Sequence, residues 1–207
     1  MTTKTTSHSS KGASKVPSER RTQILEAARE VLAQKGFEAT TVSEIVAKAG
    51  VAQGTFYLYF PSKVSLVEAL CEEMLAEILE AARAAIASAE GFAAALEAGV
   101  REVFAKSESY QDVLEIINAR MGFLGVPGEL AKLDEPYYQL VAALIAQGQA
   151  SGEVRADVNP DLSARLVVGL IERATEDCFL YRPELPKEPY IAEVTRFVVR
   201  ALAPTET

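Results

Sequence analysis

The stretch that decides the fold runs from Thr41 to Lys63 and reads Thr-Val-Ser-Glu-Ile-Val-Ala-Lys-Ala-Gly-Val-Ala-Gln-Gly-Thr-Phe-Tyr-Leu-Tyr-Phe-Pro-Ser-Lys. Thr41 and Glu44 have the spacing of a capping box, which predicts a short helix running on to Ala49. Gly50 turns the chain, and a second short helix is predicted over about 53–59. Two short helices joined by a tight glycine turn describe a helix-turn-helix, whose second helix enters the major groove of DNA.

A longer helix is predicted to precede this pair, and another to follow it. The preceding helix opens at Pro17 with Ser18 as its N-cap and ends at Gly36. Its apolar stripe consists of Ile24, Leu25, Ala28, Val31 and Leu32. The following helix begins at Ser62 or Lys63. Residues 18–63 are therefore predicted to form a three-helix domain.

The remainder of the chain is predicted to be helical as well, with segments near 92–106, 110–121, 129–151, 160–181 and 187–203. Gly122–Gly128 is predicted to be a loop, and Asn159-Pro160 has the pattern of an N-cap followed by a first helical residue. No stretch alternates with period two for long enough to form a strand. The fold class is thus all-α with about nine helices, in which a disordered arm (1–17) precedes the three-helix domain and a second helical domain covers 64–207.

The sequence lacks the catalytic residues and motifs of most familiar enzyme classes. His8 is the single histidine and lies in the polar arm, so no structured site can hold a Ser-His or Cys-His pair. Zinc sites lack ligands for the same reason, and the sequence has no glycine-rich phosphate loop. Cys71 and Cys178 are interpreted as small buried hydrophobic residues. We expect no enzyme activity, no metal and no cofactor.

The apolar segments and the charge distribution indicate where the protein works. No apolar run approaches the roughly 18 residues that a membrane span needs, and no signal peptide is evident, which predicts a soluble cytoplasmic protein. Residues 1–63 carry nine Lys/Arg and five Asp/Glu, a net charge of +4, whereas the remainder carries 12 and 24, a net charge of -12. A basic head on an acidic body favours contact of the head alone with a polyanion, although a difference of this size also arises by chance.

Arg21–Leu66 resembles the DNA-binding head of the TetR family of bacterial transcriptional regulators. The matching elements are Ile24-Leu25-Ala27-Ala28, Gly36-Phe37, Thr40-Thr41-Val42, Ile45-Val46, Ala49-Gly50-Val51, and the specific block from Gly54 to Lys63 with Leu66. The resemblance implies a ligand-responsive regulator, in most cases a repressor that leaves a palindromic operator when a small molecule binds the C-terminal domain. It also implies that residues 64–207 form a ligand-binding and dimerisation domain.

The residues expected to contact DNA are Thr41, Ala52, Gln53, Gly54, Thr55, Tyr57, Tyr59 and Lys63. The amide of Gln53 can pair bidentately with adenine, and Gly54 lets the backbone approach closely. The phenols of Tyr57 and Tyr59 can reach phosphates, as can Lys63 at the start of its helix. Ala52 is either the N-cap of the second short helix or a base contact. Each of these residues, taken singly, is also compatible with a purely structural role where two packed helices meet. The arm residues Lys4, Lys11 and Lys15 are either minor-groove contacts or solvated.

The last two helices are predicted to form a homodimer. Segments 160–181 and 187–203 both carry more than one apolar stripe, so each has to bury two faces, and a two-fold four-helix bundle satisfies both. A dimer also places two recognition helices about 34 Å apart, which matches successive half-sites on DNA.

The identity of the small-molecule effector is not readable from the sequence. The candidate ligand-binding residues are Asn118, Arg120, Met121, Phe123, Tyr137, Tyr138, Glu172 and Asp177. Glu172 interrupts an apolar run, and its partner is a cationic ligand, Arg165 or Arg173 of either chain, or water. Three other functions stay open: an activator or architectural DNA-binding protein, a helical enzyme or carrier, and a protein-interaction module.

Overall fold

The computed structural model describes the backbone of residues 15–124 and 134–204 and the side chains of residues 19–118 and 134–204. Nine α-helices lie in these residues, which confirms the all-α fold. The chain divides into two compact units, Met1–Glu68 and Ala69–Thr207. Within the described residues, no helix combines the length and the apolarity needed to cross a membrane.

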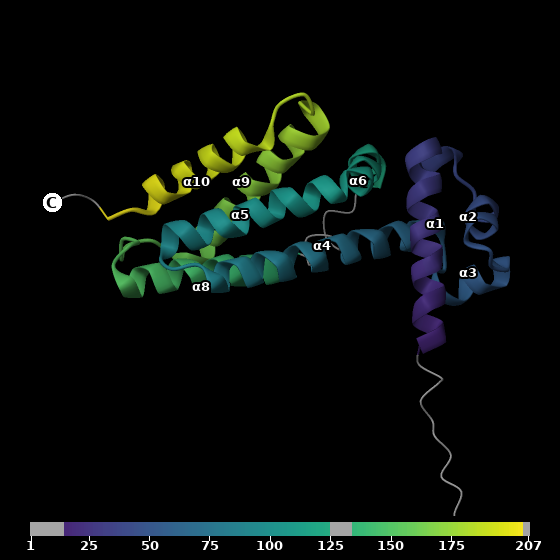
Figure 1. The fold of residues 1–207 in the computed structure, drawn as a ribbon, viewed down its shortest axis with the longest axis horizontal. Helices are drawn as coiled ribbons and strands as arrows, with labels where there is room; N and C mark the ends of the chain where they lie inside the picture. The colour runs from purple at the N-terminus through teal and green to yellow at the C-terminus, as the bar shows by residue number, and fades with distance from the viewer. Residues whose placement is uncertain (1–14, 125–133, 205–207) are drawn as a thin grey trace, which may run out of the picture. The chain divides into compact units, whose positions relative to one another are not determined.

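The first unit contains α1 (Lys15–Ala39), α2 (Val42–Ala49), α3 (Gln53–Tyr59) and the first residues of α4 (Lys63–Ser88) (Figure 1). Its buried core consists of Ile24, Leu25, Ala28, Leu32, Ile45, Phe56, Phe60 and Leu66. Gly36 breaks the helical backbone near the end of α1 with a φ of 74°, and Gly50 ends α2 with a φ of 65°. Glycine is needed at both turns because a Cβ disfavours positive φ.

The second unit contains the rest of α4, α5 (Phe92–Ser109), α6 (Gln111–Leu124), α8 (Glu135–Ser151), α9 (Pro160–Glu176), the π-helix η1 (Asp177–Tyr181) and α10 (Lys187–Leu202). α9 packs against α8, and α10 packs against α5. The predicted N-cap at Asn159 is confirmed, because its Oδ1 accepts from the backbone N–H of Leu162 at 3.0 Å.

Some of the predicted helix boundaries are wrong, including the end of α5, which runs to Ser109 where the sequence predicted about 106. α1 begins at Lys15, so Ser18 is not its N-cap; Pro17 is tolerated in the first turn, where an N–H has no helical partner. α6 continues through 122–124, since one glycine inside a helix costs only about 1 kcal/mol. The segment predicted to be helical over 160–181 is helical throughout: it is α-helical to Glu176 and continues as a π-helix, in which the N–H of Arg182 donates to the carbonyl of Asp177 at 2.8 Å, five residues back.

Several predictions fall outside the described residues. These are the arm 1–14, the rest of the 122–128 loop, and the first residues of the helix predicted over 129–151, which is described from Glu135 onward. The side chains of Lys15, Arg120, Met121 and Phe123 also lie outside the described part.

Candidate DNA-reading head and effector domain

The capping box predicted from the sequence fixes the start of α2. The N–H of Glu44 donates to Thr41 Oγ1 at 3.3 Å, and the Thr41 backbone N–H and hydroxyl both donate to Glu44 Oε2 at 2.9 Å. The ammonium of Lys35 also donates to Glu44. The hydrogen bonds from Lys35 and from Thr41 lower the pKa of Glu44 to about 2. Glu44 is therefore a carboxylate at neutral pH and ties α2 to α1.

α3 presents one face to the core and another to solvent. Phe56 and Phe60 are buried, and their rings lie 5.7 Å apart. The Tyr57 ring packs edge-on against Phe56 at 5.3 Å while half of the Tyr57 residue remains exposed. The exposed residues Gly54, Tyr57 and Leu58 lie three and four positions apart in α3, which is the spacing of a single helical stripe. This outward stripe is the surface that α3 can offer to a groove.

The structure divides the eight predicted DNA-contact residues into two groups. Thr41, Ala52, Gln53, Gly54 and Tyr57 are exposed, whereas Thr55, Tyr59 and Lys63 are half-buried. The Tyr59 ring packs against that of Phe60 at 6.4 Å. Five of the eight therefore lie open to a ligand as large as a duplex.

The sequence analysis assigned no role to two residues of the head, Leu58 and Thr40. Leu58 is 83% exposed and lies on the outward stripe of α3. Thr40 is buried, and its hydroxyl donates to the carbonyl of Gly36 at 2.7 Å, which closes the turn between α1 and α2. The exposure of Leu58 depends on which face of α3 packs inward, and the flanking aromatic residues Phe56 and Phe60 were the available signal.

Lys63 is held by the turn between α1 and α2. Its ammonium donates to the carbonyl of Thr40 at 2.7 Å and to the carbonyl of Phe37. The same nitrogen lies 4.1 Å from the centre of the Phe37 ring. Two of the three N–H groups are thus used within the head, and Lys63 joins the start of α4 to the turn that precedes α2.

Replacing Lys63 by methionine keeps the side-chain stem and removes the ammonium. We expect the free energy of unfolding of the head to fall by about 1–3 kcal/mol, because two backbone carbonyls lose a charged donor. The slope of log affinity for DNA against log salt should stay unchanged, whereas loss of a phosphate contact would reduce it by about 0.9. Thermal melts and binding titrations at several salt concentrations measure the two effects. Lys48→Met, which removes the exposed ion pair with Glu30, is the stability control.

Tyrosines and carboxylates gather where α8 begins. The phenol of Tyr137 donates to the carbonyl of Leu75 at 2.5 Å, and Tyr138 hydrogen bonds to Asp134. Burial, with the nearby Asp134 carboxylate, raises the pKa of Tyr137, and burial raises the pKa of Asp134. Tyr137, Tyr138 and Glu172, which were predicted separately, therefore share one region with Asp134.

Glu172 is the most perturbed carboxylate of this region. Partial desolvation of its carboxyl group, together with the carboxylates of Asp134 and Glu176, raises the pKa of Glu172 to about 7, while the residue as a whole is exposed. Both arginines considered as its partners bind other groups: Arg165 pairs with Glu135 at 3.1 Å and Arg173 pairs with Glu176 at 3.2 Å. Glu172 thus titrates near neutrality.

The pKa of Glu172 predicts a pH dependence of stability. The pKa of Glu172 in the folded protein lies above the ordinary value of 4.5. The contribution of Glu172 to the free energy of unfolding is therefore complete below about pH 4.5 and is lost as the pH rises through about 7. Glu172→Gln removes this loss. Near pH 8 we expect its Tm to exceed that of the wild type by about 2–4 °C, since solvent screening at this exposed position leaves an effect of about 1 kcal/mol. The two curves should converge near pH 4.5. Glu97→Gln, which removes the carboxylate paired with Arg101 on the exposed face of α5, is the control for the change of charge.

The side chains of Asn118 and Asp177 both accept hydrogen bonds from tyrosine side chains. Asn118 Oδ1 accepts from the phenol of Tyr181 at 3.2 Å, and Asp177 Oδ2 accepts from that of Tyr190 at 2.7 Å. The first bond links η1 to α6, and the second links η1 to α10. These two predicted ligand residues therefore lie around the π-helix.

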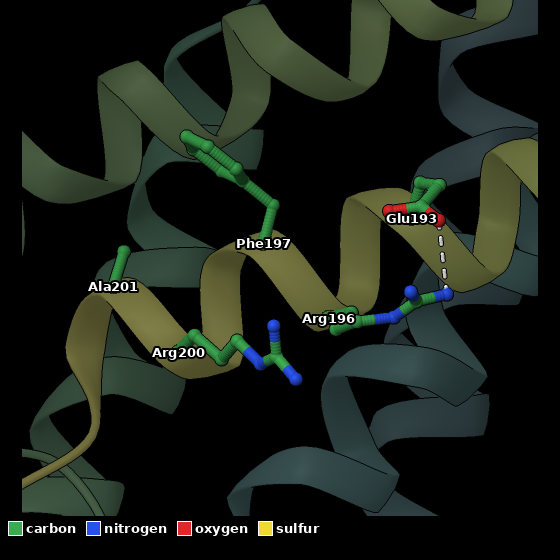
Figure 2. A pocket seen from close by; sticks show the side chains of 5 residues that line it. All are labelled: Glu193, Arg196, Phe197, Arg200 and Ala201. Carbon is green, nitrogen blue, oxygen red and sulfur yellow. Dashed lines mark ion pairs between the residues drawn. The ribbon is translucent and has the colours of Figure 1, made fainter.

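α9 and α10 each bury one face and expose another. Leu162 and Leu166 on α9 are 63% and 76% exposed, and Phe197 on α10 is 66% exposed. Figure 2 shows Phe197 and Ala201 projecting to the same side of α10, where a surface hollow is lined by Glu193, Arg196, Phe197, Arg200 and Ala201. Apolar residues thus lie on the exposed face as well as on the buried face of both helices, and the burial of the outer faces against a second chain stays a prediction.

Two family profiles match the chain. Residues 24–70 match the profile described as bacterial regulatory proteins, tetR family, and residues 96–202 match the profile described as tetracyclin repressor-like, C-terminal domain. The chain belongs to the tetR family. The tetR resemblance inferred from the head thus extends over the second unit, where the sequence alone showed only helix count and length.

Relatives along most of the chain agree with tetR membership. YvdT, an HTH-type transcriptional regulator of Bacillus subtilis, is 31% identical over 181 residues, 87% of this chain and 93% of that protein. The HTH-type transcriptional repressor KstR2 of Rhodococcus jostii is 31% identical over 155 residues, 72% of this chain and 74% of that protein. A crystal structure of FadR from Bacillus subtilis in complex with stearoyl-CoA has the same fold, with a TM-score of 0.68 at 21% identity, covering 90% of this chain and 99% of that one.

This tetR-family protein is a DNA-binding transcriptional regulator. The second helix of a helix-turn-helix is the one that reads the major groove, and α3 is the second helix of this pair.

Proposed function

We propose that the protein acts as a homodimeric repressor which binds a palindromic operator and is released when a small molecule occupies its second unit. The observation that carries the proposal is the outward stripe of α3, which leaves Gly54 and Tyr57 exposed while Phe56 and Phe60 anchor the helix. A helix held in this way can enter a groove without rearranging its core.

The predicted DNA-contact residues divide into base and backbone contacts. Gln53 at the start of α3 presents an amide that suits adenine, and Gly54 allows the helix to approach the bases. The exposed phenol of Tyr57 suits a phosphate, as do the hydroxyls of Thr41, Thr55 and Tyr59. The methyl of Ala52 adds an apolar contact beside Gln53. Lys63 supports these contacts indirectly, through its bonds to the α1–α2 turn.

The dimer forms through the outer stripes of α9 and α10. Leu162 and Leu166 are one turn apart on α9, and Phe197 supplies a large apolar surface on α10. Gly169 continues the α9 stripe, and a Cβ added there would meet nothing within 4 Å. Packing within the single chain does not require a glycine at this position. A glycine here would allow a second chain to approach the helix closely.

The effector contacts the group formed by Tyr137, Tyr138 and Glu172. The raised pKa values of Asp134 and Glu172 indicate that further negative charge is disfavoured here, so the described residues favour a neutral or cationic ligand over an anionic one. The FadR structure with stearoyl-CoA makes an acyl-CoA the second candidate. Release of labelled operator by stearoyl-CoA, compared with an organic cation of matched chain length, distinguishes the two.

The function is tested by selecting random duplex DNA with the purified protein at a stated salt concentration near physiological. A palindrome with half-sites about one helical turn apart is the expected result. Recovery of no preferred duplex would contradict operator binding, and a reporter whose expression falls on deletion of the protein would indicate an activator.

A further inference from the structure

Leu58 is the large hydrophobic residue with the highest exposed fraction in the described chain, at 83%. It lies on the seven-residue helix α3, one residue after Tyr57 and one turn after Gly54. The same outward stripe therefore carries a residue without a side chain, a phenol and an uncovered leucine. An apolar side chain at this exposed position is expected where a bound partner covers it.

The chemistry of leucine restricts what Leu58 can contact on DNA. Its side chain has no hydrogen-bonding atom, so it cannot bind a phosphate as Tyr57 can. In the major groove, the thymine C5-methyl is the apolar group, and the other base edges present donors and acceptors. A leucine placed over those polar atoms would leave them without partners, which is costly.

We propose that Leu58 is a specificity-determining residue that reads a thymine methyl group in each half-site. The inference rests on the proposed operator binding and adds to it the identity of one base. It follows that the operator contains, at the position facing Leu58, a thymine whose replacement by any other base weakens binding.

The test replaces each thymine of the selected operator, one at a time, by deoxyuridine, which differs only by the missing methyl group. The wild type should lose about fourfold in affinity at one thymine of each half-site, the factor that corresponds to ~0.8 kcal/mol for one buried methyl-sized group. Removing both methyl groups of the palindrome should give about sixteenfold. Leu58→Ala should lose this sensitivity at that thymine alone, and Leu58→Met, which keeps the apolar reach, should retain it.

The control is Leu185→Ala, at an exposed leucine in the loop before α10, which should keep the wild-type deoxyuridine profile. Because Leu58 is exposed, Leu58→Ala should melt as the wild type does. The inference is overturned if Leu58→Ala keeps the wild-type pattern of affinity losses across the deoxyuridine replacements. It is also overturned if the wild type loses the same affinity at every thymine. Either result assigns Leu58 to the sugar-phosphate backbone or to no contact. Failure of the wild type to bind any preferred duplex overturns the proposed function itself, and the inference with it.

Discussion

Gly54→Ala is expected to make the head more stable and to weaken operator binding. Gly54 lies inside α3, has no positive φ, and a Cβ added there would meet nothing within 4 Å. Alanine is favoured over glycine in a helix by about 0.5–1 kcal/mol, so the melting temperature should rise. At the groove, the added methyl group would separate the backbone from the bases, and overpacking of about 1–3 kcal/mol corresponds to a loss of about 5- to 150-fold per half-site.

Gly50→Ala is the matched control because it lies four residues earlier in the same head. Gly50 has a φ of 65°, where a side chain is strained by about 1–2 kcal/mol, so this variant should be less stable than the wild type. The two alanine variants are thus expected to shift the melting temperature in opposite directions. Wild-type operator affinity in Gly54→Ala would show that α3 does not approach DNA through its first turn.

The sequence predicted those features of the fold that depend on neighbouring residues. The capping box of Thr41 and Glu44, the turn at Gly50 and the N-cap at Asn159 each satisfy backbone groups within a few positions. The excess apolar stripe of the last helices was readable too, because helical periodicity places Leu162 and Leu166 on one face.

The roles that depend on distant residues could not be predicted in this way. Lys63 fits a phosphate contact by its place at a helix start, yet its ammonium binds a carbonyl 26 residues away. Asp177 fits a ligand contact, yet it accepts a hydrogen bond from Tyr190 on the next helix. In both cases the partner is set by tertiary packing, which has no local pattern in the sequence.

Helix lengths and the choice of exposed face were a second source of error. The π-helix at Asp177–Tyr181 follows from the bond between Arg182 and Asp177, which an apolar periodicity does not encode. Leu58 was passed over because base and phosphate contacts were sought among residues that form hydrogen bonds. Its exposure agrees with the burial of Phe56 and Phe60, both of which the sequence already indicated as core residues.

Leu166→Asp and Phe197→Asp, made separately, are expected to abolish the dimer. Each places a carboxylate in a surface that we propose is apolar and buried between two chains, and an unpaired buried charge is strongly unfavourable. Both positions are largely exposed in the single chain, so the folded monomer should remain helical. Analytical ultracentrifugation at micromolar concentration should show the dimer for the wild type and the monomer for both variants.

Operator affinity should fall with the dimer, although neither substitution lies in the head. Linking two half-site contacts in one molecule raises affinity by about 10²- to 10⁴-fold, and this gain is lost when the chains separate. Leu185→Asp places the same charge at an exposed leucine outside the α9 and α10 stripes, and should leave both the dimer and the affinity unchanged. Dimers of wild-type strength in Leu166→Asp and Phe197→Asp would move the interface to another surface. Monomers that still bind the full palindrome with wild-type affinity would show that dimerisation adds nothing to operator recognition.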